Sequence, residues 1–245
     1  MFPVICKIGP LSIYSYGVML ALAVIICSFL LAKDAQRLGI AKETIHDLVF
    51  WVVVSGIIGA RIFYILLNLD LFIKDPLEII MIQHGGLAWQ GSLILGTLGG
   101  LFFIKIKKLL LWQTLDLVAP YIALGQSIGR IGCFLNGCCF GKEISWGIYS
   151  PVHDAHLHPT QLYCSLGLFL IFLFLKKYQK TVKVVGKVFV VYLLLAALLR
   201  FSVEFFRADH DIVVFGLSIF QIICIVIFLS GLYVNSLINR HSRRN

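Results

Sequence analysis

Charged residues are scarce in this chain, since only 13% of its 245 residues are Asp, Glu, Lys or Arg, whereas 60% are hydrophobic. In soluble domains about a quarter of the residues are charged, so this composition excludes an ordinary soluble fold. The first ten residues lack the basic start, short apolar core and small-residue cleavage site of a signal peptide, so we expect the first hydrophobic run to stay as a membrane helix. The composition predicts a polytopic membrane protein with a single membrane domain over residues 1–245.

Internal repeats, low-complexity segments and Cys-x-x-Cys pairs are also missing. A lipid transporter is expected to show two corresponding halves or broken helices at matching positions. A thiol–disulfide membrane enzyme normally needs a Cys-x-x-Cys pair. The sequence therefore favours neither of these two alternatives.

Seven hydrophobic stretches are long enough to cross a bilayer. They cover approximately Leu11–Ala32, His46–Asn68, Gly85–Ile104, Thr114–Leu135, Pro159–Leu175, Val184–Phe206 and Val213–Val234. We predict an all-α fold of about seven transmembrane helices, with one longer outer loop over residues 136–158.

The net charge of +9 is distributed unevenly between the connecting segments. One alternating set of segments is rich in basic residues, namely Lys33, Arg37, Lys42, Lys105, Lys107, Lys108, Lys176, Lys177, Lys180, Lys183, Lys187, Arg240, Arg243 and Arg244. The opposite set contains only Lys7, Lys74, Lys142 and Arg207. By the positive-inside rule, the N-terminus lies outside and the C-terminus lies in the cytoplasm. The basic excess orients the chain and contacts anionic lipid, so we expect no nucleic-acid partner.

Three arginines, Arg61, Arg130 and Arg200, lie inside predicted spans. A guanidinium at membrane depth costs about 2.5 kcal/mol or more unless it is paired or lines a polar cavity. Because arginine donates bidentate hydrogen bonds and stays charged, the three residues predict a polar cavity for an anionic group such as a phospholipid headgroup. The predicted topology puts all three in the outer half of the bilayer. Structural pairing is the alternative for each, as between Arg200 and Glu204 one turn later.

Glycines punctuate the fourth span and continue into the outer loop, at Gly125, Gly129, Gly132, Gly137 and Gly141. Close helix packing is the simplest explanation for Gly125 and Gly129. Beyond the helix, glycines more readily allow a sharp turn or a close approach of the backbone to a ligand.

Three cysteines, Cys133, Cys138 and Cys139, cluster near the predicted outer surface. Three roles are possible for these cysteines: plain packing, a disulfide in an oxidising compartment, or metal or covalent chemistry. Their spacing of five and one matches no standard zinc pattern. We expect no metal and no cofactor.

The outer loop contains three histidines, His153, His156 and His158, and also Asp154. A metal cluster is the less favoured interpretation, because no fourth ligand is indicated. His158 precedes Pro159 at the start of a span, where it is placed to donate a hydrogen bond to a phosphate or to backbone.

Five segments contain most of the unusual residues: Tyr16-Gly17, His84–Gly91, Gly129–Gly141, His158–Tyr163 and Arg200–Arg207. In this order and spacing they resemble the bacterial prolipoprotein diacylglyceryl transferases, which are multi-pass enzymes of the inner membrane. The resemblance runs from about Ile8 to Tyr233. It implies transfer of the diacylglyceryl group of phosphatidylglycerol to the lipobox cysteine of a preprolipoprotein. A thioether forms and glycerol phosphate leaves.

The resemblance also implies roles for individual residues. Arg130 and Arg200 match the signature arginine and a late arginine of the family, and we expect both to be catalytic by stabilising the charge of the leaving phosphate. The expected substrate-binding residues are Arg130, Tyr16, Gln90, Asn136, His158 and Arg61. The residues expected to give structural support are Glu204, Arg207, Gly129 and Gly141.

Four positions depart from the family pattern. Cys133 and Cys138 replace a signature asparagine and glutamate, Gln90 replaces a histidine of the third span, and Ala196 replaces a tyrosine before the late arginine. His84 aligns with a different position and is not taken as the missing base. Two alternatives follow: a diverged paralogue that uses another acceptor or lipid, and a non-catalytic lipid-binding or transport protein.

Overall fold

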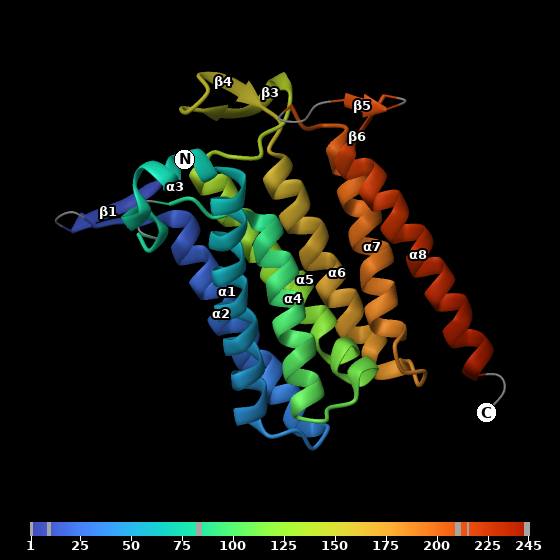
Figure 1. Ribbon diagram of the computed structural model, residues 1–245. Helices are drawn as coiled ribbons and strands as arrows, with labels where there is room; N and C mark the ends of the chain where they lie inside the picture. Colours follow the sequence, from blue (N-terminus) through green and yellow to red (C-terminus); the bar gives the residue numbers. More distant parts are fainter. Residues whose placement is uncertain (1, 9–10, 82–84, 209–211, 215, 243–245) are drawn as a thin grey trace. The chain divides into compact units, whose positions relative to one another are not determined.

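The computed structural model describes residues 2–8, 11–81, 85–208, 212–214 and 216–242, so His84 lies outside the described residues. Within them, a helix of at least 18 residues occupies each of the predicted spans. These helices are α1 (Ser15–Arg37), α2 (Lys42–Leu67), α4 (Trp89–Ile106), α5 (Leu111–Asn136), α6 (Thr160–Thr181), α7 (Lys187–Glu204) and α8 (Ile219–Ser242) (Figure 1).

Two predicted spans begin too early, because short strands precede their helices. The first hairpin pairs β1 (Val4–Ile8) with β2 (Leu11–Tyr14) before α1 begins. Before α8, β5 (Ile212–Val214) pairs with β6 (Leu217–Ser218), and Gly216 between them has a φ of +75°. Glycine adopts this left-handed conformation without steric cost, so the apolar run bends back as a hairpin before the helix starts.

Five of the long helices, α1, α2, α4, α6 and α8, are long and apolar enough to cross a membrane. Many of the large apolar side chains point outward: Phe29 is 67% exposed, Phe102 66% and Leu166 62%. Such extensive apolar exposure is unfavourable in water and favourable against lipid chains. The prediction of an all-helical polytopic membrane protein is therefore confirmed.

The chain forms two compact units, residues 1–30 with 115–245 (the large unit) and residues 31–114 (the small unit). In the small unit, α2 packs along α4 and is followed by α3 (Leu69–Lys74) and the 3-10 helix η1 (Pro76–Ile79). A methyl group added at Gly59 would collide with the carbonyl of Gly91, and one added at Gly91 would collide with the carbonyl of Gly59. This close backbone approach positions the first turn of α4.

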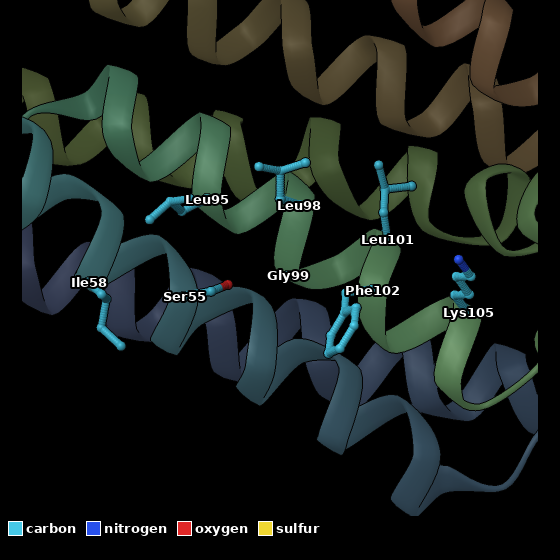
Figure 2. Close-up of a pocket in the computed structure, with 8 residues that line it drawn as sticks. All are labelled: Ser55, Ile58, Leu95, Leu98, Gly99, Leu101, Phe102 and Lys105. Carbon is cyan, nitrogen blue, oxygen red and sulfur yellow. The ribbon is translucent and has the colours of Figure 1, made fainter.

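An apolar groove of about 590 Å³ runs between these two helices, as Figure 2 shows. Ser55 and Ile58 of α2 line it together with residues of α4, among which Lys105 is the charged residue. A groove of this composition suits lipid chains and offers little to an anionic headgroup. This groove is therefore not the phosphate-binding cavity predicted from the arginines.

In the large unit, α6 packs on α7 and α7 packs on α8. A buried cluster joins Ala119 and Ala123 of α5, Leu175 of α6, and Val188 and Tyr192 of α7. Asp116 accepts hydrogen bonds from the backbone nitrogens of Gly186 and Phe189, and so caps the N-terminus of α7. Asp116 is not among the residues predicted from the sequence to have a role.

The hairpins of the large unit lie at one end of its helices (Figure 1). There β3 (Glu143–Ser150) pairs with β4 (Ala155–Leu157), with Tyr149 opposite His156. The C-terminal ends of α5 and α7 and the N-terminal ends of α6 and α8 meet the hairpins at this end. These helix ends contain predicted functional residues, namely Arg130 and Asn136 of α5, Arg200 and Glu204 of α7, and His158 just before α6.

Candidate active site

A buried carboxylate organises the C-terminal end of α7. The Glu204 side chain is fully buried, and its Oε2 lies 2.7 Å from Nη2 of Arg200 and 3.9 Å from Nε of Arg207. Ser218 donates a hydrogen bond of 3.0 Å to the other carboxylate oxygen. The pairing of Arg200 with Glu204 predicted from their spacing is present, and it holds the guanidinium in one orientation.

Arg200 keeps a terminal nitrogen for another partner. Its Nη1 is buried and has no hydrogen-bond partner among the described residues. The guanidinium carbon lies 5.2 Å from the centre of the Phe220 ring, a cation–π distance. A buried donor without an acceptor costs about 1–3 kcal/mol, so this nitrogen suits an anionic ligand.

Three arginines of the large unit interact electrostatically. Arg130 of α5 interacts with Arg207, and Arg200 interacts with both of them. Glu204 balances one of the three positive charges. The arrangement leaves an excess of positive charge at this end of the helices, which an anion such as a phosphate would neutralise.

The segment His158–Tyr163 holds the loop that follows α5. Thr160 Oγ1 donates to the Cys139 carbonyl at 2.8 Å, and the buried Gln161 Nε2 donates to the Cys138 carbonyl at 2.7 Å. These contacts explain why both polar side chains lie buried at the start of α6. Neither Thr160 nor Gln161 is among the site residues predicted from the sequence.

His158 is half-buried beside the same loop. Its Nδ1 lies 3.2 Å from the Tyr163 hydroxyl, and its ring packs against Trp146 and Phe206 at centroid distances of 5.0 and 5.4 Å. The loop histidines do not converge, because His153 Nε2 contacts the Gly137 carbonyl at 3.1 Å and His156 Nδ1 contacts the Gly147 carbonyl at 2.9 Å. His153 and His156 are thus each held by a different backbone carbonyl.

Gly141 lies where three segments cross. Its nitrogen donates to the His158 carbonyl at 3.1 Å, and it forms an isolated β-bridge with Arg207. A methyl group at this position would come within 2.5 Å of His158 Cβ and 2.7 Å of the Phe206 carbonyl oxygen. The predicted structural role of Gly141 thus has a steric basis, since only glycine fits.

The glycines of α5 differ in how tightly they pack. A methyl group at Gly129 would meet only Leu20, at 3.8 Å, and one at Gly125 would meet the Cys27 sulfur at 3.5 Å, which are ordinary contacts. At Gly132 the same methyl would come within 3.0 Å of Met19 and 3.2 Å of Tyr16. Close packing between α5 and α1 therefore centres on Gly132.

Tyr16 and Asn136 border the cysteine loop. Tyr16 is 40% exposed and interacts electrostatically with Arg130 and with the thiols of the loop. Asn136 ends α5, and its side chain is hydrogen-bonded to Cys138. Both residues predicted to bind substrate therefore lie beside the arginine cluster of the large unit.

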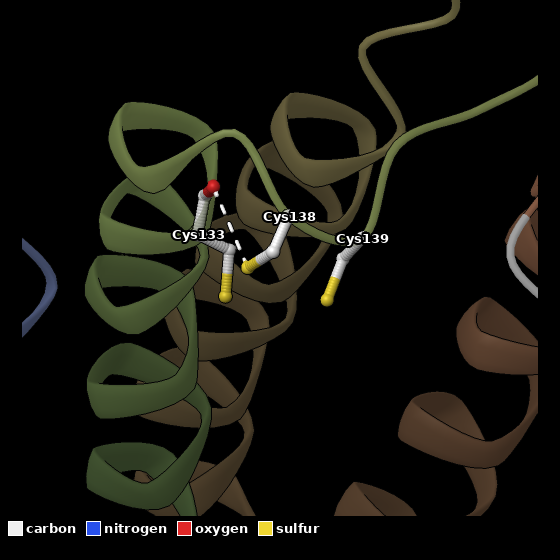
Figure 3. A group of neighbouring side chains, drawn as sticks. All are labelled: Cys133, Cys138 and Cys139. Carbon is white, nitrogen blue, oxygen red and sulfur yellow. Dashed lines mark hydrogen bonds between the residues drawn. The ribbon is translucent and has the colours of Figure 1, made fainter. Parts of the chain in front are cut away.

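The sulfur atoms of Cys133, Cys138 and Cys139 all lie within 4.8 Å of one another (Figure 3). All three are free thiols, so the proposed disulfide is not formed in this structure. Hydrogen bonds from the Cys133 and Cys138 thiols, together with the positive charges of Arg207 and Arg130, lower the pKa of the Cys139 thiol well below its usual range.

Two predicted site residues, Arg61 and Gln90, lie in the small unit. The guanidinium of Arg61 is hydrogen-bonded to backbone carbonyl groups. It is buried and donates to the carbonyls of five residues: Glu78, Ile79, Met81, Gly85 and Gly86. Its guanidinium also lies 5.3 Å from the centre of the Phe72 ring. A guanidinium has five N–H donors, so five carbonyl acceptors match its hydrogen-bonding capacity. This favours the structural alternative for Arg61. Gln90 is half-buried in the first turn of α4.

Comparison with known proteins gives a consistent result. A family model described as prolipoprotein diacylglyceryl transferase matches residues 3–236. A phosphatidylglycerol–prolipoprotein diacylglyceryl transferase of Clostridium tetani is 34% identical over 242 residues, covering 96% of each chain. Proteins of the same name from Oceanobacillus iheyensis and Trichormus variabilis are 35% and 37% identical, and the matches cover 93% and 84% of this chain and 83% and 79% of theirs.

Proposed function

The chain belongs to the prolipoprotein diacylglyceryl transferase family, and we propose that it catalyses the transfer of a diacylglyceryl group through Arg200 and Arg130. The donor is phosphatidylglycerol and the acceptor is the lipobox cysteine thiol of a preprolipoprotein. The thiolate sulfur attacks the glyceryl carbon, the bond from that carbon to the phosphate oxygen breaks, and glycerol phosphate leaves. The product is a thioether.

The buried Nη1 of Arg200 is the observation that carries this assignment. Negative charge grows on the phosphate as the carbon–oxygen bond breaks, and a fixed donor aimed at that charge stabilises the transition state more than the ground state. Glu204 holds the other end of the guanidinium at 2.7 Å, so the donor does not have to reorganise during the reaction. Arg130 and Arg207 add positive charge to the same site.

Neighbouring polar groups complete the site in this proposal. His158 is oriented through Nδ1 by Tyr163, so its Nε2 is directed to donate to a phosphate oxygen. Asn136 and Tyr16 contact the headgroup from the ends of α5 and α1. Gln90, in the small unit, stays a predicted substrate-binding residue, whereas Arg61 of the same unit stabilises the segment that follows η1.

The enzyme crosses the bacterial inner membrane seven times in this proposal, with the N-terminus outside. Support comes from the large unit, where Lys176 and Lys180 of α6 and Arg240 of α8 lie at the helix ends remote from Arg200. By the positive-inside rule, the site then opens toward the outer leaflet.

Labelling of introduced single cysteines tests this orientation. Labels should reach positions in the Lys142–His158 loop from outside the cell, and Lys107 and Lys180 only after the membrane is permeabilised. Labelling of the loop only from the cytoplasmic side would overturn both the topology and the outer-leaflet site.

The activity itself is tested in membranes that contain this protein, with labelled phosphatidylglycerol and a lipobox peptide. With the label in the acylated glyceryl group, the label should stay on the peptide after ester hydrolysis, because a thioether joins that group to sulfur. A matched peptide with serine in place of the lipobox cysteine should remain unlabelled. Equal labelling of both peptides, or of neither, would contradict the proposed reaction.

A further inference from the structure

The sulfur atoms of the three thiols at the end of α5 lie close enough together in space to form a metal-ligand set. Cys133 lies in the last turns of α5, and Cys138 and Cys139 lie in the loop after it. Figure 3 shows their sulfur atoms on the same side of this loop. The sulfurs lie within 4.8 Å of one another. A zinc–sulfur bond of about 2.3 Å places thiolates about 3.8–4.0 Å apart in tetrahedral or trigonal geometry, so a shift of about 1 Å or less closes the set.

The backbone of the loop is folded to make the sulfurs converge. Gly137 has a φ of +78°, and Cys139 adopts the left-handed region with a φ of +61°, which is uncommon for a residue with a side chain. The nitrogen of Cys138 donates to the Cys133 carbonyl at 3.2 Å, which closes the turn after the helix. Backbone strain of this kind persists only where surrounding contacts hold it.

Those contacts come from α6. Gln161 and Thr160 donate to the carbonyls of Cys138 and Cys139 at 2.7 and 2.8 Å, and both side chains are buried. These hydrogen bonds hold the backbone of Cys138 and Cys139 and so preorganise the ligand set. The Cys138 thiol also donates to the Cys133 carbonyl at 3.7 Å (Figure 3).

Positive charge lies near the three sulfur atoms. Three thiolates around a divalent cation give a net charge of −1, and Arg130 interacts electrostatically with Cys133 and Cys139. The positive charge of Arg207 also acts on Cys139. Soft thiolate ligands select soft or borderline cations such as zinc over magnesium or calcium. The three sulfurs fill three positions of a tetrahedral site, and a catalytic zinc keeps its fourth position open.

We propose that Cys133, Cys138 and Cys139 bind one zinc-class cation and that the thiol of the acceptor cysteine occupies its fourth position. This inference rests on the proposed function. A thiol that coordinates zinc loses its proton, which passes to water or to the departing phosphate. The bound thiolate then forms the sulfur–carbon bond while the carbon–oxygen bond breaks, and the electron pair leaves with glycerol phosphate beside Arg130 and Arg200. No atom is oxidised or reduced, and the cation is unchanged.

Metal binding is measured on the purified full-length chain in detergent under reducing conditions, in a Cys6→Ser background that removes an exposed thiol. Zinc is titrated and counted per chain, and cadmium serves as a second probe through its thiolate charge-transfer absorption. We expect one ion per chain. Serine at any of the three positions should weaken binding more than about 100-fold, since loss of even an outer-shell partner costs about 10–100-fold.

Two variants separate ligation from folding. Cys139→His keeps a zinc ligand at a backbone conformation that histidine tolerates, so it should retain more zinc affinity than Cys139→Ser. Cys27→Ser removes a thiol of α1 outside the cluster and should change neither binding nor transfer. Weak binding that the serine variants do not alter, or a disulfide among the three cysteines in protein taken directly from membranes, would overturn the site.

Transfer activity is then measured with labelled phosphatidylglycerol and a lipobox peptide. Chelation should abolish transfer and added zinc should restore it, in parallel with the bound metal. Full transfer in metal-depleted enzyme would overturn the inference and leave the proposed function intact. Stoichiometric zinc on these cysteines without any transfer would contradict the proposed function and, with it, the catalytic role of the cation.

Discussion

Replacing Arg200 by lysine separates the hydrogen-bonding geometry of this side chain from its charge. One terminal nitrogen of Arg200 lies 2.7 Å from Glu204, and the other is buried without a partner among the described residues. Lysine has a single nitrogen on a flexible stem, so it cannot hold the carboxylate and present a second, planar donor to a phosphate. The variant therefore keeps the positive charge and loses the preorganised donor.

The expected size of the effect follows from that one donor. Loss of a single preorganised donor to a developing oxyanion typically costs about 2.7–4 kcal/mol, which corresponds to about 10²–10³ in kcat. Because the lysine charge still attracts the phosphate, we expect a fall at the lower end, about a hundredfold in kcat. The change in KM should be smaller, because the donor acts mainly on charge that develops in the transition state. Arg130→Lys should show a comparable loss.

The assay is transfer of labelled diacylglyceryl to a lipobox peptide in membranes, corrected for the amount of folded protein. Arg37→Lys is the matched control, because Arg37 pairs with Asp34 at 3.5 Å but is 68% exposed. Exposed pairs contribute about 0–1 kcal/mol, so this control should transfer at nearly the original rate. A rate for Arg200→Lys within about threefold of the original enzyme, a barrier change of only about 0.7 kcal/mol, would refute the reasoning about Nη1.

Four further substitutions test other parts of the structure. Glu204→Gln should lower the free energy of unfolding by about 3–5 kcal/mol, because it leaves buried arginine charge without its carboxylate; thermal unfolding in detergent measures this loss. Arg61→Met should lower the unfolding temperature and expose the segment after η1 to proteolysis, while KM for phosphatidylglycerol stays unchanged. Gly91→Ala should destabilise the small unit by about 1–3 kcal/mol, because the added methyl overlaps the backbone of α2. Gln90→His should change the transfer rate by less than about a hundredfold, the low end of general-base contributions.

Each of these predictions has an outcome that contradicts it. For Glu204, this is a loss no larger than that of Arg37→Met, which breaks the pair with Asp34 at an arginine side chain that is 68% exposed. A raised KM with unchanged stability would return Arg61 to the substrate site. Gly17→Ala is the control for Gly91, because a methyl there meets no described residue within 4 Å. An inert original enzyme that Gln90→His alone activates would show that a histidine base is obligatory.

Much of the fold follows from local patterns in the chain. Long apolar runs predict the helices because a bilayer requires about 20 apolar residues per span. The Arg200–Glu204 pair also follows, because residues four apart lie on one helix face. The starts of α1 and α8 could not be read in this way, since β2 and β5 are as apolar as the helices they precede and the turns between strands decide the difference.

The sequence alone determined the membrane class, the resemblance to the transferase family and the three arginines inside long apolar stretches. It could not tell those arginines apart, because the partners of a guanidinium depend on which backbone folds over it. The tertiary structure surrounds Arg61 with five carbonyls and leaves Nη1 of Arg200 without a described partner. The cysteines show the same division, since a spacing of five and one predicts no metal site. Left-handed conformations at Gly137 and Cys139 nevertheless bring the three sulfurs within 4.8 Å, because a turn joins residues that no linear pattern relates.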